Sequence, residues 1–110
     1  MMGRDAALHQ GMPILLAGAP VDQAKAAMVL LHGRGATAED ILGLAQEFDA
    51  PDVAYLAPQA ANATWYPNRF IAPVASNEPW LSSALGVVDS IVTQVQAVGL
   101  PATRIFLLGF

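Results

Sequence analysis

The sequence contains no cysteine, so it can form neither a disulfide framework nor a thiolate metal site. Two histidines also leave few ligands for zinc, and we expect no metal and no other cofactor. Positive charge is equally scarce. The five basic residues stand singly along the chain, at Arg4, Lys25, Arg34, Arg69 and Arg104. Because nucleic acids and anionic lipid surfaces are bound by clustered positive charge, this scatter excludes both as partners.

Long apolar runs are also missing. No run approaches the roughly 20 residues that a membrane-spanning helix needs. The first ten residues lack the apolar block of a secretory signal, and we therefore expect a cytoplasmic protein. Charged residues make up only 13% of the chain and hydrophobic residues 55%, whereas an average domain carries roughly 25% charged residues. This composition is typical of a piece of a larger core.

The most informative stretch begins with the apolar run 26–31, which has the length of a strand buried on both faces. Gly33 and Gly35 allow the backbone to leave the sheet sharply. Thr37 is expected to cap the helix that follows, with Asp40 completing a capping box. Such a turn directs backbone N–H groups outward at the carboxyl end of a strand, where α/β sheets bind ligands. It can hold a phosphate or the oxyanion formed when an ester is attacked.

Hydrophobic patterning predicts the other elements of an α/β fold with a mostly parallel, doubly wound sheet. Further strands are expected at 12–18, 53–57 and 104–108, helices at 37–48 and 80–98, and a long irregular segment at 58–78. The first strand should pair antiparallel with 26–31, because only a short link joins them. Strands 26–31 and 53–57 should be parallel, because a helix joins them. The apolar strand 104–108 should lie inside the sheet, and residues 1–11 should form a loose lead-in.

The helix 80–98 should pack through one apolar stripe. This stripe consists of Leu81, Leu85, Val88, Val92 and Val95. Ser76 or Asn77 is expected to cap the helix, and Gly99 to end it in the left-handed conformation.

The sequence resembles the phospholipase/carboxylesterase family of α/β-hydrolases, which includes the acyl-protein thioesterases. The matching segments are 30–35 (Leu-Leu-His-Gly-Arg-Gly), Asp40, 57–60 (Ala-Pro-Gln-Ala) with Trp65 and Tyr66, and 104–110 (Arg-Ile-Phe-Leu-Leu-Gly-Phe). The resemblance covers nearly all of the chain from Met12 onward. It implies that residues 1–110 are the amino-terminal half of a single α/β-hydrolase domain, ending just before the nucleophile elbow Gly-x-Ser-x-Gly. Gly109 is then the first glycine of the elbow, and Phe110 is the residue that precedes the serine.

In such hydrolases a serine attacks an ester or thioester carbonyl, helped by a histidine that an acid orients. The resemblance implies that the serine follows Phe110 directly and that the acid and the histidine come later, so residues 1–110 alone would be inactive. His9 and His32 are then not the general base, and His32 is expected to be structural, with its ring bonded locally beside the turn. The implied activity is hydrolysis of carboxylic esters, thioesters or lysophospholipids. The resemblance also admits a homodimer.

The resemblance further implies that this half supplies an oxyanion hole through the backbone N–H of Arg34, between Gly33 and Gly35. Because changing a side chain does not remove a backbone donor, Arg34→Ala is expected to matter less than changes at either glycine.

Aromatic side chains are the second candidate group. Trp65, Tyr66 and Phe70 can form one wall of the acyl or alcohol pocket, or they can simply anchor the long loop on the sheet. Gln59, at the carboxyl end of its strand, is a weaker candidate.

Two alternative functions stay open at this point. Gly33-x-Gly35-x-x-Ala38 also matches the dinucleotide fingerprint of a Rossmann oxidoreductase, which needs an acidic residue at the end of the next strand. Gln59 stands there instead. The other alternative is a non-catalytic fragment or interaction module, in which the strand 104–108 offers an unpaired edge to another chain.

Overall fold

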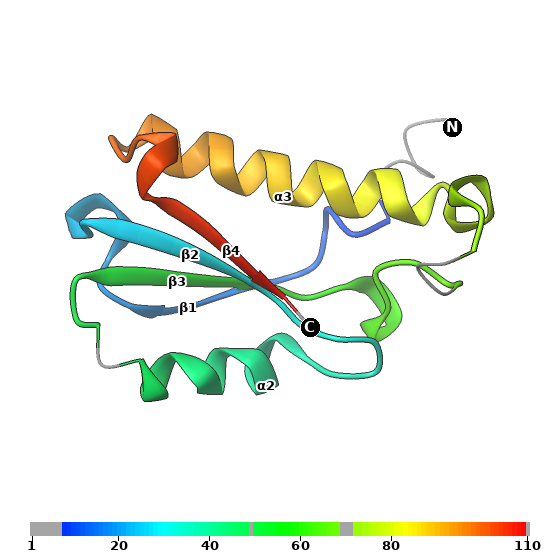
Figure 1. Ribbon diagram of the computed structural model, residues 1–110, viewed down its shortest axis with the longest axis horizontal. Helices are drawn as coiled ribbons and strands as arrows, with labels where there is room; N and C mark the ends of the chain where they lie inside the picture. The colour runs from blue at the N-terminus through cyan, green and yellow to red at the C-terminus, as the bar shows by residue number, and fades with distance from the viewer. Residues whose placement is uncertain (1–7, 49, 69–71, 110) are drawn as a thin grey trace.

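The computed structural model describes residues 8–48, 50–68 and 72–109, which form one four-stranded sheet with a helix on each face (Figure 1). The strands are β1 (Ile14–Gly18), β2 (Ala26–Leu31), β3 (Val53–Pro58) and β4 (Ile105–Gly109), and the α-helices are α2 (Ala38–Leu42) and α3 (Trp80–Ala97). Short 3-10 helices lie at Val21–Gln23, Gly43–Glu47, Ala61–Ala63, Val74–Asn77 and Ala102–Arg104. The predicted α/β class and the four strands are confirmed. No helix among the described residues is long and apolar enough to cross a membrane.

The strand order is β1-β3-β2-β4, with β2 parallel to both β3 and β4. The expected antiparallel sense of β1 is right, but its expected partner is wrong, because β1 pairs with β3 and not with β2. Both sides of β2 are taken by parallel neighbours. The link between β1 and β2 crosses the start of β3, where Ala19 N–H donates to Val53 O and Lys25 N–H donates to Asp52 O.

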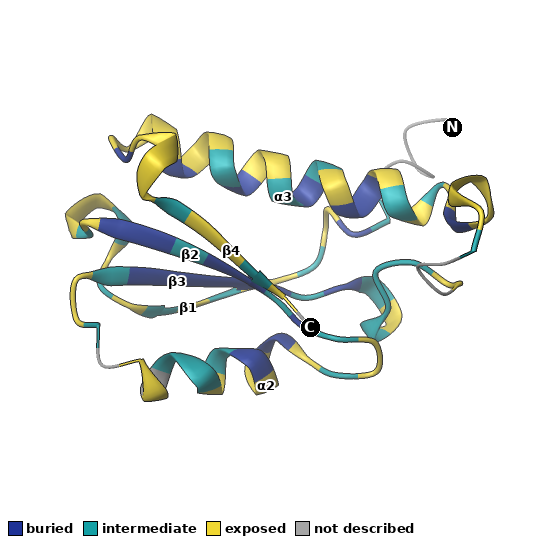
Figure 2. Cartoon of the chain, viewed as in Figure 1, coloured by how far each residue is buried: buried dark blue, intermediate teal, exposed yellow. Residues whose placement is uncertain are grey.

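The core consists of two apolar layers, one on each face of the sheet. Alternate residues of the central strands face α3, as Ala27, Val29 and Leu56 do, or face α2, as Leu30 and Tyr55 do. This alternation follows from the two-residue period of a strand. Figure 2 shows the result, with β2 and β3 as the most deeply buried strands.

The expectation that strand 104–108 lies buried in the sheet is wrong for the described residues. Phe106 is 50% exposed and Leu107 58% exposed, and β4 forms the edge of the sheet beside β2 (Figure 2). An apolar strand is buried on both faces only when other elements cover it. No described element lies on the far side of β4.

The helix after β2 begins as predicted and ends earlier. Thr37 Oγ1 accepts from Asp40 N–H, and the Asp40 carboxylate accepts from Thr37 N–H, so the capping box is confirmed. The α-helix ends at Leu42 and continues as a 3-10 helix from Gly43 to Glu47. Glycine at the junction has a low helix propensity, which favours this change.

The long helix α3 lies within the predicted range, but two details of the prediction are wrong. Its buried residues are Ser83, Ala84, Val87, Ile91 and Val95, so only Val95 belongs to the expected stripe. Leu85 is 62% exposed. Leu81, Val88 and Val92 of the expected stripe are half-buried, so the face that contacts the sheet is rotated from the expected one.

The second wrong detail concerns the start of α3, which is not capped by Ser76 or Asn77. The N-cap is Pro79 and makes no side-chain bond. Glu78 instead accepts from both the hydroxyl and the backbone N–H of Ser82. The predicted stop is confirmed, because Gly99 follows the helix with a φ of 115°.

Candidate functional site

The loop after β2 is a tight turn that uses two of the four backbone donors of residues 33–36 within the described part of the chain. Gly35 N–H donates to Ala63 O over 2.8 Å, and Ala36 N–H donates to Gly33 O over 3.1 Å. Gly35 has a positive φ of 78°, a backbone conformation that favours glycine over other residues. Gly33 does not have a positive φ. Among the described residues, the N–H of Arg34 donates no hydrogen bond. The N–H of Gly33 likewise donates none among the described residues, so the turn offers two adjacent backbone donors, of which that of Arg34 is at the predicted position.

His32 fastens the base of this turn to the loop after β3. Its side chain is buried, with 1% of its surface exposed. Ala60 N–H donates to Nε2 over 3.0 Å, which leaves the proton on Nδ1, and Nδ1 donates to Gly33 O over 2.8 Å. Both ring nitrogens are thus occupied in a neutral imidazole. The local ring bond expected beside the turn is present.

Gln59 holds the start of α2 and does not point into open space. Its Oε1 accepts from Ala38 N–H over 2.8 Å, and its Nε2 donates to Ala60 O over 3.1 Å. The side chain therefore satisfies one of the free N–H groups at the helix start, as a capping residue does.

The side chain of Arg34 reaches across to the loop after β3. Nη1 donates to Pro67 O over 3.2 Å, and Nη2 donates to Tyr66 O over 3.1 Å and to Asn68 O over 2.8 Å. Sequence reasoning expects this side chain to matter less than the neighbouring glycines and misses these contacts. No local pattern indicates them, because the partners are backbone carbonyls more than 30 residues away.

The two loops enclose a small hollow of about 140 Å³, lined by His32, Arg34, Trp65 and Tyr66. The indole of Trp65 stacks on His32, with ring centroids 5.2 Å apart, and its Nε1–H donates to His32 O over 3.0 Å. The turn and two of the three predicted aromatic residues are thus neighbours. The third, Phe70, lies outside the described residues.

A larger apolar hollow of about 350 Å³ lies on the α2 side of the same turn. Its lining residues are His32, Gly33, Ala36, Asp40, Ile41 and Leu44. The turn therefore has open space on two sides, one aromatic and one aliphatic.

The chain is similar to two esterases of known structure. A phospholipase/carboxylesterase from Dyadobacter fermentans is 46% identical to it with a TM-score of 0.86, over 90% of this chain and 47% of the other. Esterase PE8 is 27% identical with a TM-score of 0.65, over 90% of this chain and 51% of the other. The fold is that of an α/β-hydrolase. No family model and no curated protein that was searched matches the chain.

The chain spans about half the length of each of these two structures. At its carboxyl end, Gly109 pairs in register with Leu31, the residue before His32. A Cβ on Gly109 would lie 3.5 Å from Leu31 Cβ, an ordinary contact, so the described neighbours do not themselves require glycine there. Phe110 lies outside the described residues. The end of β4 therefore lies beside the start of the turn.

The strand order of the sheet argues against the dinucleotide alternative. A Rossmann sheet runs in the order 3-2-1, which would place β4 beside β3. Here β4 lies on the opposite side of β2. The start of α2 is also occupied, because Ala38 N–H donates to Gln59 and Asp40 N–H to Thr37, so these donors are not free for a pyrophosphate.

Among the described residues, His9 is a buried polar residue that sequence reasoning missed. His9 was assigned to a loose lead-in, but it is 2% exposed. Ala61 N–H donates to its Nδ1 over 3.0 Å, its Nε2–H donates to Trp65 O over 2.8 Å, and its own N–H donates to Ser83 Oγ over 2.9 Å. The expectation is therefore wrong for His9 and Gln10, whose side chains bond to the loop after β3 and to α3 respectively. A single histidine before the first strand carries no sequence signal of this.

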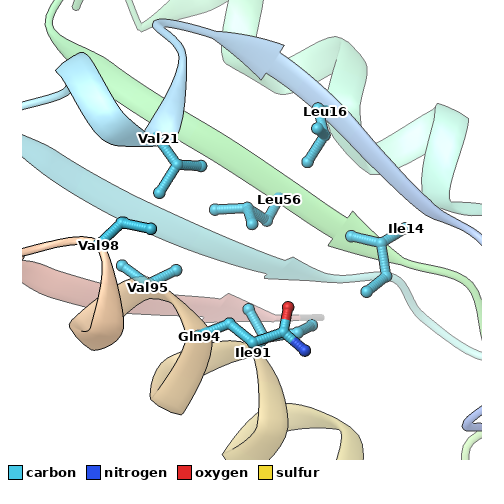
Figure 3. A pocket seen from close by; sticks show the side chains of 8 residues that line it. All are labelled: Ile14, Leu16, Val21, Leu56, Ile91, Gln94, Val95 and Val98. Carbon is cyan, nitrogen blue, oxygen red and sulfur yellow. The ribbon is translucent and has the colours of Figure 1, made fainter.

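A third hollow, of about 330 Å³, lies between α3 and the outer part of the sheet (Figure 3). Of its eight lining side chains, Gln94 is the polar one, and none comes from the loops after β2 or β3. Without convergent polar groups it does not have the character of a catalytic site.

Proposed function

We propose that this chain is the amino-terminal half of a serine hydrolase that cleaves small carboxylic esters or thioesters, lysophospholipids among them. In this proposal the chain supplies one oxyanion-hole donor and a wall of the substrate pocket. The observation that carries it is the N–H of Arg34, which donates no hydrogen bond among the described residues and lies in a turn beside the end of β4. The similarity to two esterases supports the same conclusion.

The chemistry follows from the position of this donor. A serine directly after Phe110 would continue β4 and so approach the turn that begins next to Leu31. When its hydroxyl attacks a carbonyl carbon, negative charge develops on the carbonyl oxygen. A fixed backbone N–H at that point stabilises the charge, and such a donor contributes about 2.7–4 kcal/mol to the transition state.

Neither described histidine suits the role of general base in this proposal. Each of their four ring nitrogens already bonds to a backbone group. A general base needs a free nitrogen within hydrogen-bond reach of the nucleophile. The base is therefore expected in the part of the enzyme that follows this chain.

Two of the predicted aromatic residues support the pocket assignment. Trp65 and Tyr66 line the same hollow as Arg34, so an ester held at the donor would have one substituent against aromatic rings. The aliphatic hollow on the α2 side would take the other. This favours apolar esters of small molecules as substrates.

The test is an ester assay on the longer protein that contains this chain. p-Nitrophenyl acetate, butyrate and octanoate are offered to that protein and to a variant in which the serine after Phe110 is alanine. We expect hydrolysis by the first and none above background by the second, and covalent labelling of that serine by a fluorophosphonate. Equal rates in both proteins, or no hydrolysis by either, would contradict the proposal and favour the interaction-module alternative.

A further inference from the structure

The guanidinium of Arg34 carries an inference that rests on the proposed function and deepens it. Its described partners are three consecutive backbone carbonyls, those of Tyr66, Pro67 and Asn68, at 2.8–3.2 Å. We propose that Arg34 is a positioning residue, whose side chain couples the turn that bears the oxyanion donor to the aromatic wall of the pocket.

The geometry of this contact suits arginine specifically. Two nitrogens of one planar group share three carbonyl oxygens, and Nη2 uses both of its hydrogens. A lysine ammonium lacks the planar fork and cannot bridge the same span with fixed directions. Bonds from a charged donor are also stronger than those between neutral groups, which matters at an exposed site where water competes.

The hydrogen bonds of Arg34 reach a later part of the loop after β3 than the other hydrogen bonds between the two loops do. Gly35 N–H to Ala63 O, and the bonds made by His32, hold residues 60–65. Residues 66–68 are held to the turn by Arg34. On their other side, Asn68 N–H donates to the buried Asn77 over 2.7 Å. Arg34 thus connects the turn to the segment that leads into α3.

The consequence is that one residue serves the site twice. Its backbone N–H is the proposed oxyanion donor, and its side chain fixes the carbonyls next to Trp65 and Tyr66. Because the two groups share one Cα, loosening the side chain lets the donor and the wall shift relative to each other. We therefore expect Arg34 to act on the rate of the chemical step and on the discrimination between acyl chain lengths.

The first experiment reads the coupling without any assay of activity. Trp80 and any tryptophan outside residues 1–110 are replaced by phenylalanine, so that Trp65 is the one emitting indole. Its emission and its quenching by acrylamide are then compared in the parent, Arg34→Lys and Arg34→Met. Arg104→Met, which removes an exposed arginine in the 3-10 helix before β4, is the matched control. We expect greater quenching in Arg34→Met, an intermediate value in Arg34→Lys and no change in the control. Unchanged Trp65 quenching in Arg34→Met overturns the proposal.

The second experiment measures kinetics in the longer enzyme, at a temperature where far-UV circular dichroism shows every variant folded. Misplacement of a catalytic group by about 1 Å can cost roughly 100-fold in rate. We expect Arg34→Met to lower kcat by roughly 10- to 100-fold with a smaller change in KM, and to flatten the preference among acyl chain lengths. Arg34→Lys should recover part of kcat.

The two experiments separate this inference from the proposed function. If the parent enzyme cleaves no ester, the proposed function fails, and the Trp65 measurement still decides whether Arg34 couples the loops. If the parent enzyme is active and Arg34→Met changes Trp65 but neither kcat nor chain-length preference, the contact is merely structural and the positioning role is overturned.

Discussion

The loops after β2 and β3 meet at the same end of the sheet and are held in different ways. The loop after β2 is short and is organised by its own residues, through the positive φ of Gly35 and the reciprocal bonds of Thr37 and Asp40. The loop after β3 is long and is held by residues from elsewhere, His9, His32 and Arg34 among them. The comparison shows that one site can combine a loop whose conformation is set by its own residues with a loop whose conformation depends on contacts with distant residues.

The largest expected effect comes from removing the proposed oxyanion donor of the loop after β2 while the loop keeps its structure. Replacing the Arg34 amide by an ester, with the α-hydroxy analogue of arginine, removes the N–H and keeps the side chain. This N–H has no partner among the described residues, but the ester also weakens Gly33 O as the acceptor for Ala36 N–H and His32 Nδ1–H, so stability should fall by about 1 kcal/mol. In the longer enzyme kcat/KM should fall roughly 100- to 1,000-fold.

The matched control for this ester is the same replacement at Gly35. Its N–H donates to Ala63 O, so removing it should cost about 1 kcal/mol of unfolding free energy. Urea unfolding and p-nitrophenyl butyrate hydrolysis measure the two quantities. If the Arg34 ester kept full activity, the oxyanion assignment would be wrong.

The next largest effect should strike the second loop. His9→Ala and His32→Ala each leave buried backbone groups of this loop without a partner and open a cavity. We expect each to cost about 2–4 kcal/mol of unfolding free energy in urea titrations. Gln94→Ala, on the exposed face of α3, is the control and should change stability by less than about 0.5 kcal/mol.

The two histidines should also be coupled. Both rings contact Trp65, His9 at 5.1 Å and His32 at 5.2 Å between centroids. Contacts shared through one residue are non-additive. The double variant should therefore lose less stability than the sum of the single losses, and exact additivity would show that the rings act on separate parts of the loop.

The same division explains what the sequence could and could not predict. The bounds of β2 match the prediction, and β3 extends it by one residue, because a short apolar run between turn residues specifies a buried strand locally. The capping box was predictable because Thr37 and Asp40 are three residues apart. The buried role of His9 was not, because its ring partners lie 52 and 56 residues away.

The wrong predictions have a similar cause. The short link between β1 and β2 suggests that these strands pair. In the sheet, however, β3 lies on one side of β2 and β4, from the end of the sequence, lies on the other, so β1 pairs with β3 instead. The buried face of α3 was misjudged because several rows of apolar residues follow the helical period. The sheet covers the row of Ser83, Ala84, Val87, Ile91 and Val95, and the helical period alone does not distinguish this row from its neighbour.

A smaller effect tests the local organisation of the first loop. Thr37→Ala removes the side-chain acceptor for Asp40 N–H and leaves the rest of the turn unchanged. Loss of such a cap costs about 1 kcal/mol, which should appear as a lower urea midpoint with an unchanged slope. Thr37→Ser keeps the hydroxyl and should restore most of the loss. If both variants had the same stability as the parent, the loop would depend on its glycine rather than on its cap.

The smallest expected effect lies where the second loop enters α3. The hydroxyl and the N–H of Ser82 donate to the Glu78 carboxylate and lower its pKa below the usual 4.5. A carboxyl whose pKa is lower in the folded state stabilises the fold above its unfolded pKa, and this contribution is lost as the pH falls through the folded value. Between pH 7 and pH 3 the parent should therefore lose slightly more stability than Glu78→Gln, measured as the difference in urea midpoints. Because this side chain is fully exposed, the difference should shrink in 1 M salt. A Glu78→Gln variant with the same pH dependence as the parent would show that the start of α3 is fixed by the packing of its buried face alone.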